Sequence, residues 1–117
     1  MEVTLSWYQV SDIERAKKFY GEVLGLKKTF EIEGWCEFSH AHGAAAVALN
    51  QLREDDPERG ATVVLRVDDL ATAQGEMKQK GAKFEGEVQE IPGVVRIATF
   101  RDPDGNRLQL CQVLMQQ

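Results

Sequence analysis

The chain has 117 residues, 43% of them hydrophobic, which fits one compact domain with a core of its own. Its 14 basic and 19 acidic residues give a formal net charge of -5, which argues against nucleic acid or an anionic membrane surface as the main partner. No apolar run approaches the roughly 20 residues that span a bilayer, and the first residues do not resemble a signal peptide. We therefore expect a cytoplasmic protein whose partner is a small organic molecule.

A strand, a helix cap and a helix are predicted at the start of the chain. Residues 3–10 are β-prone, and Ser11 and Asp12 offer side-chain oxygens that can cap a helix. Apolar residues then recur at helical spacing over residues 13–24, and Gly25 stands where a left-handed residue would end that helix. The apolar stripe of the helix must cover a sheet.

The same pattern returns about 57 residues later, which points to duplication of one supersecondary unit. The segment Val10–Ala16 aligns with Val67–Ala73, and a second helix is predicted from about Leu70 to Lys80, before Gly81. Strand-like segments follow each helix, at 28–32, 35–39 and 44–50, and then at 83–89, 94–101 and 106–113. Each half therefore has the pattern βαβββ.

Two turns and a linker complete this division of the chain. The segment His40–Gly43 takes the place of Asp102–Gly105, which contains the turn sequence Pro-Asp-Gly. Residues 52–60 are polar and are interrupted by Pro57 and Gly60. We expect a single domain over residues 1–117, with module one at about 1–51, the linker at about 52–60 and module two at about 61–117.

The histidines and cysteines do not form a metal-binding or disulfide pattern. His40 and His42 have the spacing that would place both rings on one face of a strand, but they fall at a predicted hairpin tip with no acid or thiol assigned nearby. We interpret them as part of a solvated turn. Cys36 and Cys111 lie in no C-x-x-C motif, and we interpret them as buried thiols.

Three motifs together resemble the vicinal oxygen chelate superfamily, which includes glyoxalase I, extradiol dioxygenases and bleomycin-resistance proteins. They are V-x-D-[IL]-x-x-A-x-x-F-Y at Val10–Tyr20, L-G-L at Leu24–Leu26 and F-R-D-P-D-G-N-R-L-Q-L at Phe100–Leu110. The resemblance implies an α+β fold of two βαβββ modules in tandem, forming a cup-shaped curled mixed sheet with the helices outside and the binding site inside. It also implies a homodimer. The fold alone does not select an activity.

Metal-dependent members of the superfamily bind one divalent ion with four strand residues. The resemblance carries these positions onto Leu5, Ala48, Thr62 and Gln109. Leucine and alanine have no lone pairs, threonine is a poor neutral ligand, and glutamine offers only an uncharged carbonyl oxygen. We therefore expect no metal and no other cofactor.

Strand alternation predicts which other side chains line the cup. If Leu5 faces inward, Trp7 and Gln9 do too, and Trp35 and Glu37 follow because Phe38 is expected in the core. For module two the same reasoning gives Thr62, Arg66, Arg96, Phe100 and Gln109. The aromatic rings suit a flat or apolar ligand, and the polar groups suit a carboxylate, phosphate or carbonyl. Alternatively, the rings fill the cup, Arg66 pairs with Glu37 or another acid, and the side chains of Arg66 and Arg96 extend to the rim.

Three functions remain open from the sequence. The first is a metal-free protein of the bleomycin-resistance type that binds a small organic ligand in its cup. The second is a lyase or isomerase of the glyoxalase type, in which Glu37 is the candidate general base because burial would raise its pKa. The third is a regulatory or partner-binding domain whose cup is closed by its own side chains.

Overall fold

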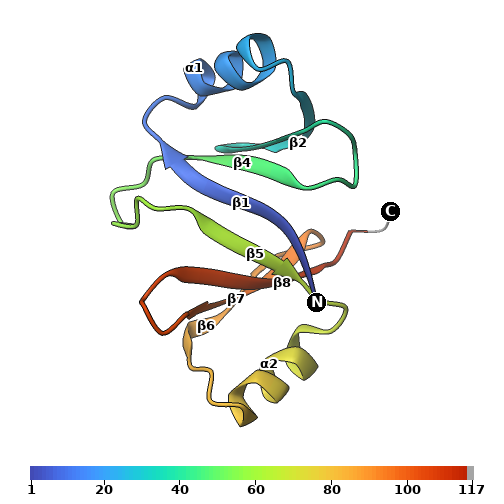
Figure 1. The fold of residues 1–117 in the computed structure, drawn as a ribbon, viewed down its shortest axis with the longest axis vertical. Coiled ribbons are helices and arrows are strands. Elements are labelled where there is room, and N and C mark those ends of the chain that lie inside the picture. Colours follow the sequence, from blue (N-terminus) through green and yellow to red (C-terminus); the bar gives the residue numbers. More distant parts are fainter. Residues whose placement is uncertain (116–117) are drawn as a thin grey trace. The chain divides into compact units, whose positions relative to one another are not determined.

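The computed structural model describes residues 1–115, and these form two βαβββ modules (Figure 1). The chain divides into two compact units, one of Thr4–Ala61 and the other of Met1–Val3 together with the chain from Thr62 onward. The predicted α+β class and the repeat of βαβββ are confirmed. No helix within residues 1–115 is long and apolar enough to cross a membrane.

Module one contains four strands, one α-helix and one π-helical turn. The elements are β1 (Glu2–Val10), α1 (Ile13–Lys18), the π-helical turn η1 (Phe19–Val23), β2 (Lys27–Ile32), β3 (Trp35–Ser39) and β4 (Ala46–Gln51). The strand order is β2-β3-β4-β1; β1 runs parallel to β4, and β3 runs antiparallel to both of its neighbours. The parallel pair requires the crossover that α1 provides.

The first helix begins as predicted and ends differently. Asp12 caps it, since its side chain accepts a hydrogen bond from the Arg15 N–H at 3.2 Å. From Phe19 the turn widens, because Leu24 N–H donates to the carbonyl of Phe19, five residues back. The prediction of a continuous α-helix to residue 24 is therefore wrong in its last turns, because apolar spacing does not distinguish an α turn from a π turn. Gly25 follows with a φ of +73°.

Each sheet is covered by its helix on one face only. In module one, Cys36, Phe38 and Leu49 form a buried cluster, and its partly buried neighbours are Tyr8, Val10, Ile13, Ala16, Tyr20, Leu26 and Val47. This confirms that Phe38 lies in the core and that Cys36 is a buried thiol, and it shows that Tyr8 and Val10 pack toward the helix. We call the opposite face of each sheet its helix-free face.

Module two repeats this organisation. Its elements are β5 (Thr62–Arg66), α2 (Leu70–Gln79), β6 (Phe84–Ile91), β7 (Val95–Arg101) and β8 (Arg107–Val113), with strand order β5-β8-β7-β6. Asp69 caps α2 by accepting from the Thr72 N–H at 3.0 Å. The core under α2 consists of Val67, Leu70, Ala98, Phe100 and Leu110. Cys111 is buried, as predicted.

A glutamine from the sheet holds the start of each helix. The Gln51 Oε1 accepts from the Ile13 N–H at 3.0 Å, and its Nε2 donates to the Ser11 carbonyl at 2.9 Å. In module two, the Gln112 Oε1 accepts from the Leu70 N–H at 2.9 Å. Each contact satisfies a first-turn N–H that has no partner within its helix. The sequence repeat did not suggest this role.

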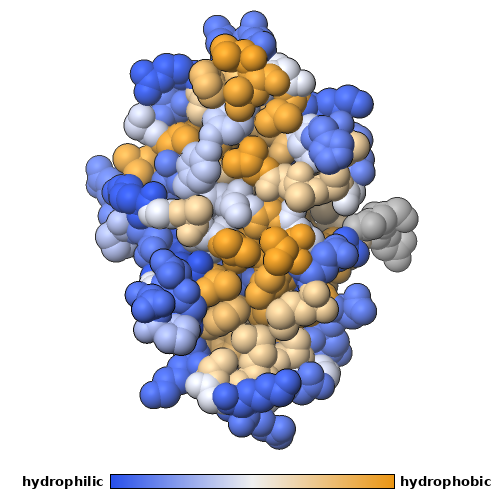
Figure 2. Space-filling view, viewed as in Figure 1, coloured by the Kyte–Doolittle hydropathy of each residue, from blue (hydrophilic) through white to orange (hydrophobic). Residues whose placement is uncertain are grey.

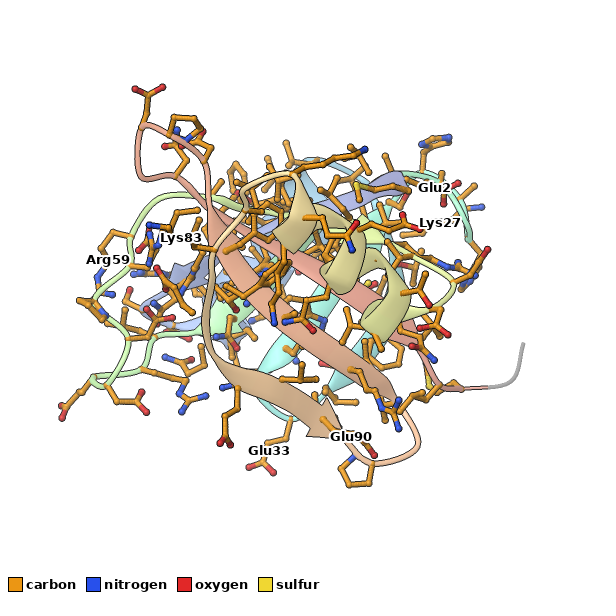
Figure 3. All side chains as sticks on the ribbon, turned by 90° about the horizontal axis from the view of Figure 1, so that it is seen from below. Glu2, Lys27, Glu33, Arg59, Lys83 and Glu90 are labelled. Atoms are coloured by element: carbon orange, nitrogen blue, oxygen red, sulfur yellow. The ribbon has the colours of Figure 1, made fainter. Side chains whose placement is uncertain are left out.

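Several apolar side chains are exposed at the end of the helical segment of module one. Phe19, Val23 and Leu24 are 49%, 70% and 51% exposed, and Figure 2 shows hydrophobic residues at the surface over the helical segment. His40 and His42 are both exposed in the turn before β4, where they were predicted. Arg59, labelled in Figure 3, is exposed in the linker, and its guanidinium donates to the carbonyls of Asp56 and Glu58.

Candidate functional site

The helix-free face of module one is built from alternate residues of three neighbouring strands. Trp7 on β1 lies opposite Ala48 on β4, and Ala48 lies opposite Glu37 on β3. In the next row, Trp35 lies opposite Asn50. Because residues directly opposite on neighbouring strands share a face, these side chains project from the side of the sheet that α1 does not cover. The predicted orientations of Trp7, Trp35 and Glu37 are confirmed.

Trp35 contacts both Trp7 and Glu37. The rings of Trp7 and Trp35 meet edge to face, with centroids 5.5 Å apart and an interplanar angle of 66°. The Trp35 Nε1–H donates to Oε2 of Glu37 at 2.8 Å. Ala48, which is wholly buried, lies between the strands that carry them, and its methyl group leaves the space above it to the larger side chains.

Glu37 is a half-buried carboxylate with no cationic partner. Desolvation raises its pKa above the ordinary value, and the hydrogen bond from Trp35 partly opposes this shift. Glu37 forms no ion pair with any residue of the described chain. A carboxylate in this setting can hold a cation, accept a hydrogen bond or take up a proton.

Gln9 lies on this face, but its side-chain amide is hydrogen-bonded to the linker. Its Nε2 donates to the carbonyls of Asp56 and Glu58 at 3.1 and 2.8 Å, and its Oε1 accepts from the Arg53 N–H at 2.7 Å. The amide group thereby makes three hydrogen bonds to the segment after β4. The prediction that Gln9 offers its amide to a ligand competes with this structural role.

The helix-free face of module two carries Thr62, Val64 and Arg66 from β5 and Gln109 from β8. Thr62 is wholly buried, and its Oγ1 accepts from the Arg107 Nε at 2.7 Å. The Gln109 Nε2 donates to Oγ1 of Thr99 at 3.1 Å. Arg66 is half-buried and has no hydrogen bond or ion pair with the residues that the structure describes.

Arg96 and Phe100 were assigned to this face, and that assignment is wrong. Phe100 belongs to the core under α2, where its ring packs against Phe84 with centroids 5.3 Å apart. Arg96 shares the parity of Phe100 on β7, and its exposed Nε pairs with Oε1 of Glu90 at 2.8 Å. The helix-free face receives Thr99 from β7 instead.

Sequence reasoning missed Thr99 and Arg107, although a signal for both was present. Gln109 stands between Leu108 and Leu110, and this alternation fixes the two faces of β8. In the antiparallel pair, Thr99 lies opposite Gln109, and Arg101 lies opposite Arg107. Transferring the alternation of β8 to β7 would have placed Thr99 on the helix-free face and Phe100 in the core.

The four positions implied by the resemblance do not fit a divalent ion. Leu5 and Ala48 offer no donor atom, and the guanidinium of Arg107 already donates to Thr62, which places a positive charge beside that oxygen. Gln109 adds only a neutral amide. Within residues 1–115, no three His, Cys, Asp or Glu side chains gather in a group able to hold a metal ion.

A separate hollow of about 370 Å³ lies on the outer side of module one, between α1 and the β2–β3 turn. Lys17 bonds both Glu14 and Glu31 there, and the hydrogen bonds from Lys17 and Lys28 to Glu31 lower its pKa to about 2. Figure 3 shows Glu33, at the edge of this hollow, pointing away from the ribbon. The charges of Lys17, Glu14 and Glu31 are satisfied by one another, so the helix-free faces remain the stronger candidates.

Comparison with known proteins identifies the class of this fold. Residues 3–110 match the model of the Glyoxalase/Bleomycin resistance protein/Dioxygenase superfamily, and the chain belongs to that superfamily. The resemblance read from the three motifs is confirmed.

Individual relatives agree with this class. A glyoxylase-like domain-containing protein of Didymella fabae is 28% identical over 109 residues, covering 86% of this chain and 85% of its own. A methylmalonyl-CoA epimerase structure superposes with a TM-score of 0.80 at 17% identity, covering 97% of this chain and 95% of the epimerase. The methylmalonyl-CoA epimerase of Mycobacterium tuberculosis gives 0.77 at 21% identity, covering 96% and 87%. At these identities the structures establish the fold alone.

Proposed function

We propose that this protein binds a small organic ligand on its helix-free sheet surface without a metal ion, and that Trp7, Trp35 and Glu37 form the centre of the site in module one. One observation carries the proposal: a half-buried carboxylate without an ion-pair partner accepts a hydrogen bond from Trp35, whose ring packs against that of Trp7. Leaving a carboxylate desolvated and unpaired costs stability, so a ligand-binding role is a reason for its presence. Membership of the superfamily supports the same conclusion.

The two tryptophans of the chain provide a direct assay, because both lie in this cluster. A panel of amines, amino acids, thiols, aromatic acids and antibiotics is screened by thermal shift, and each hit is titrated by tryptophan fluorescence. A ligand at a hundred times its dissociation constant should stabilise the fold by about 2.7 kcal/mol. Trp35→Phe should weaken binding of the hit, whereas His42→Ala, in an exposed turn, should leave it unchanged. A panel without a single hit would instead favour a helix-free surface closed by its own side chains.

The metal-free part of the proposal has its own test. The protein is dialysed against nickel, zinc or manganese, then against buffer, and its metal content is measured by elemental analysis. We expect far less than one ion per chain, because Leu5, Ala48, Thr62 and Gln109 offer no charged donor. One tightly held ion per chain would overturn this part and leave ligand binding to be judged by the panel.

A second function is favoured by the raised pKa of Glu37. A carboxylate with that property is suited to remove a proton from a carbon beside a carbonyl group. The assay follows deuterium uptake from D2O into ketone or thioester ligands found in the panel. Exchange that disappears in Glu37→Gln while binding persists would support catalysis; equal exchange in both proteins would remove Glu37 as the base.

A further inference from the structure

In module one, the Glu37 carboxylate and the neighbouring indole rings all attract positive charge. This common property indicates which class of ligand the site accepts. Of the two Glu37 carboxylate oxygens, Oε2 accepts from Trp35, while Oε1 has no hydrogen bond or ion pair with any residue of 1–115. Within the same residues, no side-chain oxygen that lacks a partner is wholly buried, so this oxygen reaches solvent. A ligand can therefore contact it directly.

The neighbouring rings, like the carboxylate, attract a positively charged ligand group. The face of an indole ring is electron-rich and attracts cations, and among the aromatic side chains tryptophan does so most strongly. Trp7 and Trp35 meet edge to face at 66°, and the N–H edge of Trp35 points at Glu37, so the carboxylate lies at the border of this aromatic pair. A carboxylate beside electron-rich rings attracts an ammonium group and disfavours a carboxylate or phosphate.

The surroundings do not supply a competing cation. Glu37 forms no salt bridge with the described residues, and the lysines nearest in sequence, Lys27 and Lys28, lie on the edge strand β2, where Lys28 pairs with Glu31. The Glu37 charge is therefore not neutralised within the described chain. A cationic ligand would supply the missing partner and remain in contact with apolar rings.

We propose that module one binds the ammonium group of an amine-bearing organic molecule, with Glu37 accepting its hydrogen bonds, the Trp35 ring packing against its apolar part and the buried Trp7 ring supporting Trp35. This inference rests on the proposed binding function and names the ligand class for that site. It differs from the anionic ligand groups that the arginines suggested from the sequence: Arg96 lies on the other face of module two, and Arg66 belongs to module two and not to this cluster.

Three matched probes separate charge from shape: 2-phenylethylamine, 2-phenylethanol and phenylacetate, each titrated into the protein by tryptophan fluorescence. We expect a saturable change with the amine, at concentrations where the alcohol and the acid have no effect. Glu37→Gln should weaken the amine at least about tenfold, since a charge-assisted hydrogen bond is lost. The glutamine still offers an oxygen to the Trp35 N–H. The fold of the Glu37→Gln variant is checked by circular dichroism.

Glu87→Gln is the control for net charge. Glu87 is exposed on β6 in module two, so this variant changes the charge of the chain equally without touching the cluster, and it should bind the amine like the unmodified protein. Equal or tighter binding of phenylacetate, or unchanged amine affinity in Glu37→Gln, would overturn the proposed ligand class. So would no response to any of the three probes. The binding function itself is tested separately by the wider panel. Any ligand of that panel whose binding is weakened by Trp35→Phe would support it.

Discussion

Trp35 donates its indole N–H to the carboxylate of Glu37 two residues further along β3, and the two side chains are joined at 2.8 Å on the face that α1 leaves uncovered. The bond favours the ionised form of Glu37, whereas burial favours the protonated form, and burial has the larger effect on the pKa. The protonation of Glu37 therefore depends on both its burial and its hydrogen bond with Trp35.

Replacing Trp35 by phenylalanine should raise the pKa of Glu37 further. The substitution keeps an aromatic ring but removes the N–H that stabilises the carboxylate. The measurement is a pH titration of the labelled glutamate side chains by NMR, with the Glu37 signal assigned from Glu37→Gln. Trp7→Phe is the matched control, because it alters the same aromatic pair and leaves the hydrogen bond in place. A pKa that falls, or stays fixed, in Trp35→Phe would contradict the assignment of this bond.

Glu37→Gln should stabilise the fold at neutral pH. The pKa of Glu37 is raised in the folded chain, so the folded state holds its proton more tightly than the unfolded state does, and ionisation costs stability above the folded pKa. Glutamine carries no charge and avoids that cost. The difference in melting temperature between variant and parent should therefore be positive near pH 7 and shrink as the pH falls through the folded pKa toward the ordinary value of 4.5.

Thermal melts over a series of pH values provide this test, with Glu87→Gln melted alongside. Glu87 is exposed, so its replacement should produce no comparable pH-dependent difference. A Glu37→Gln variant that is less stable than the parent at neutral pH would show that the carboxylate is held by a favourable interaction.

Phe100→Ala should destabilise module two by about 3–5 kcal/mol, the usual cost of removing a core phenylalanine. Phe100 is only 8% exposed and packs with Phe84 and Leu110 under α2. Arg96→Ala, on the same strand, should change stability by less than about 1 kcal/mol, because its ion pair with Glu90 is exposed. Chemical denaturation measures both. If both substitutions caused similarly small losses of stability, the placement of Phe100 in the core would be wrong and its assignment to the helix-free face would be restored.

The contrast between Glu37 and Phe100 shows where strand alternation succeeds and where it fails. On β3, Cys36 and Phe38 are clearly apolar and Glu37 is polar, so the two faces could be assigned from the sequence. On β7, Ile97, Ala98 and Phe100 are apolar on both parities, so the strand by itself does not indicate its covered face. The neighbouring β8, with Gln109 between two leucines, resolves this, but only after the pairing of the strands is known.

Other features depended on tertiary contacts that have no local pattern. The fold was predictable because both halves repeat an aspartate cap, an amphipathic helix and three strands. The use of Gln9 to hold the linker requires Arg53, Asp56 and Glu58 to return to β1 after more than 40 residues, and no spacing rule predicts that. The π-helical turn likewise differs from an α-helix in which carbonyls its N–H groups reach, as for Leu24 and Phe19, and the apolar spacing does not report this.

Gln51→Ala should destabilise the protein more than Gln112→Ala, although both glutamines hold the first N–H of a helix. Gln51 accepts from Ile13 and donates to the Ser11 carbonyl at 2.9 Å, with a weaker contact to the Val10 carbonyl at 3.4 Å, whereas the structure gives Gln112 one such bond, from Leu70. With roughly 1 kcal/mol for each hydrogen bond, we expect losses of about 2 and about 1 kcal/mol in the free energy of unfolding. Chemical denaturation measures the losses, and Gln79→Ala, at the exposed end of α2, serves as the control. If Gln112→Ala proved the more damaging, the start of α2 would depend on its sheet contact more than that of α1, and the similarity between the two modules would not extend to how their helices begin.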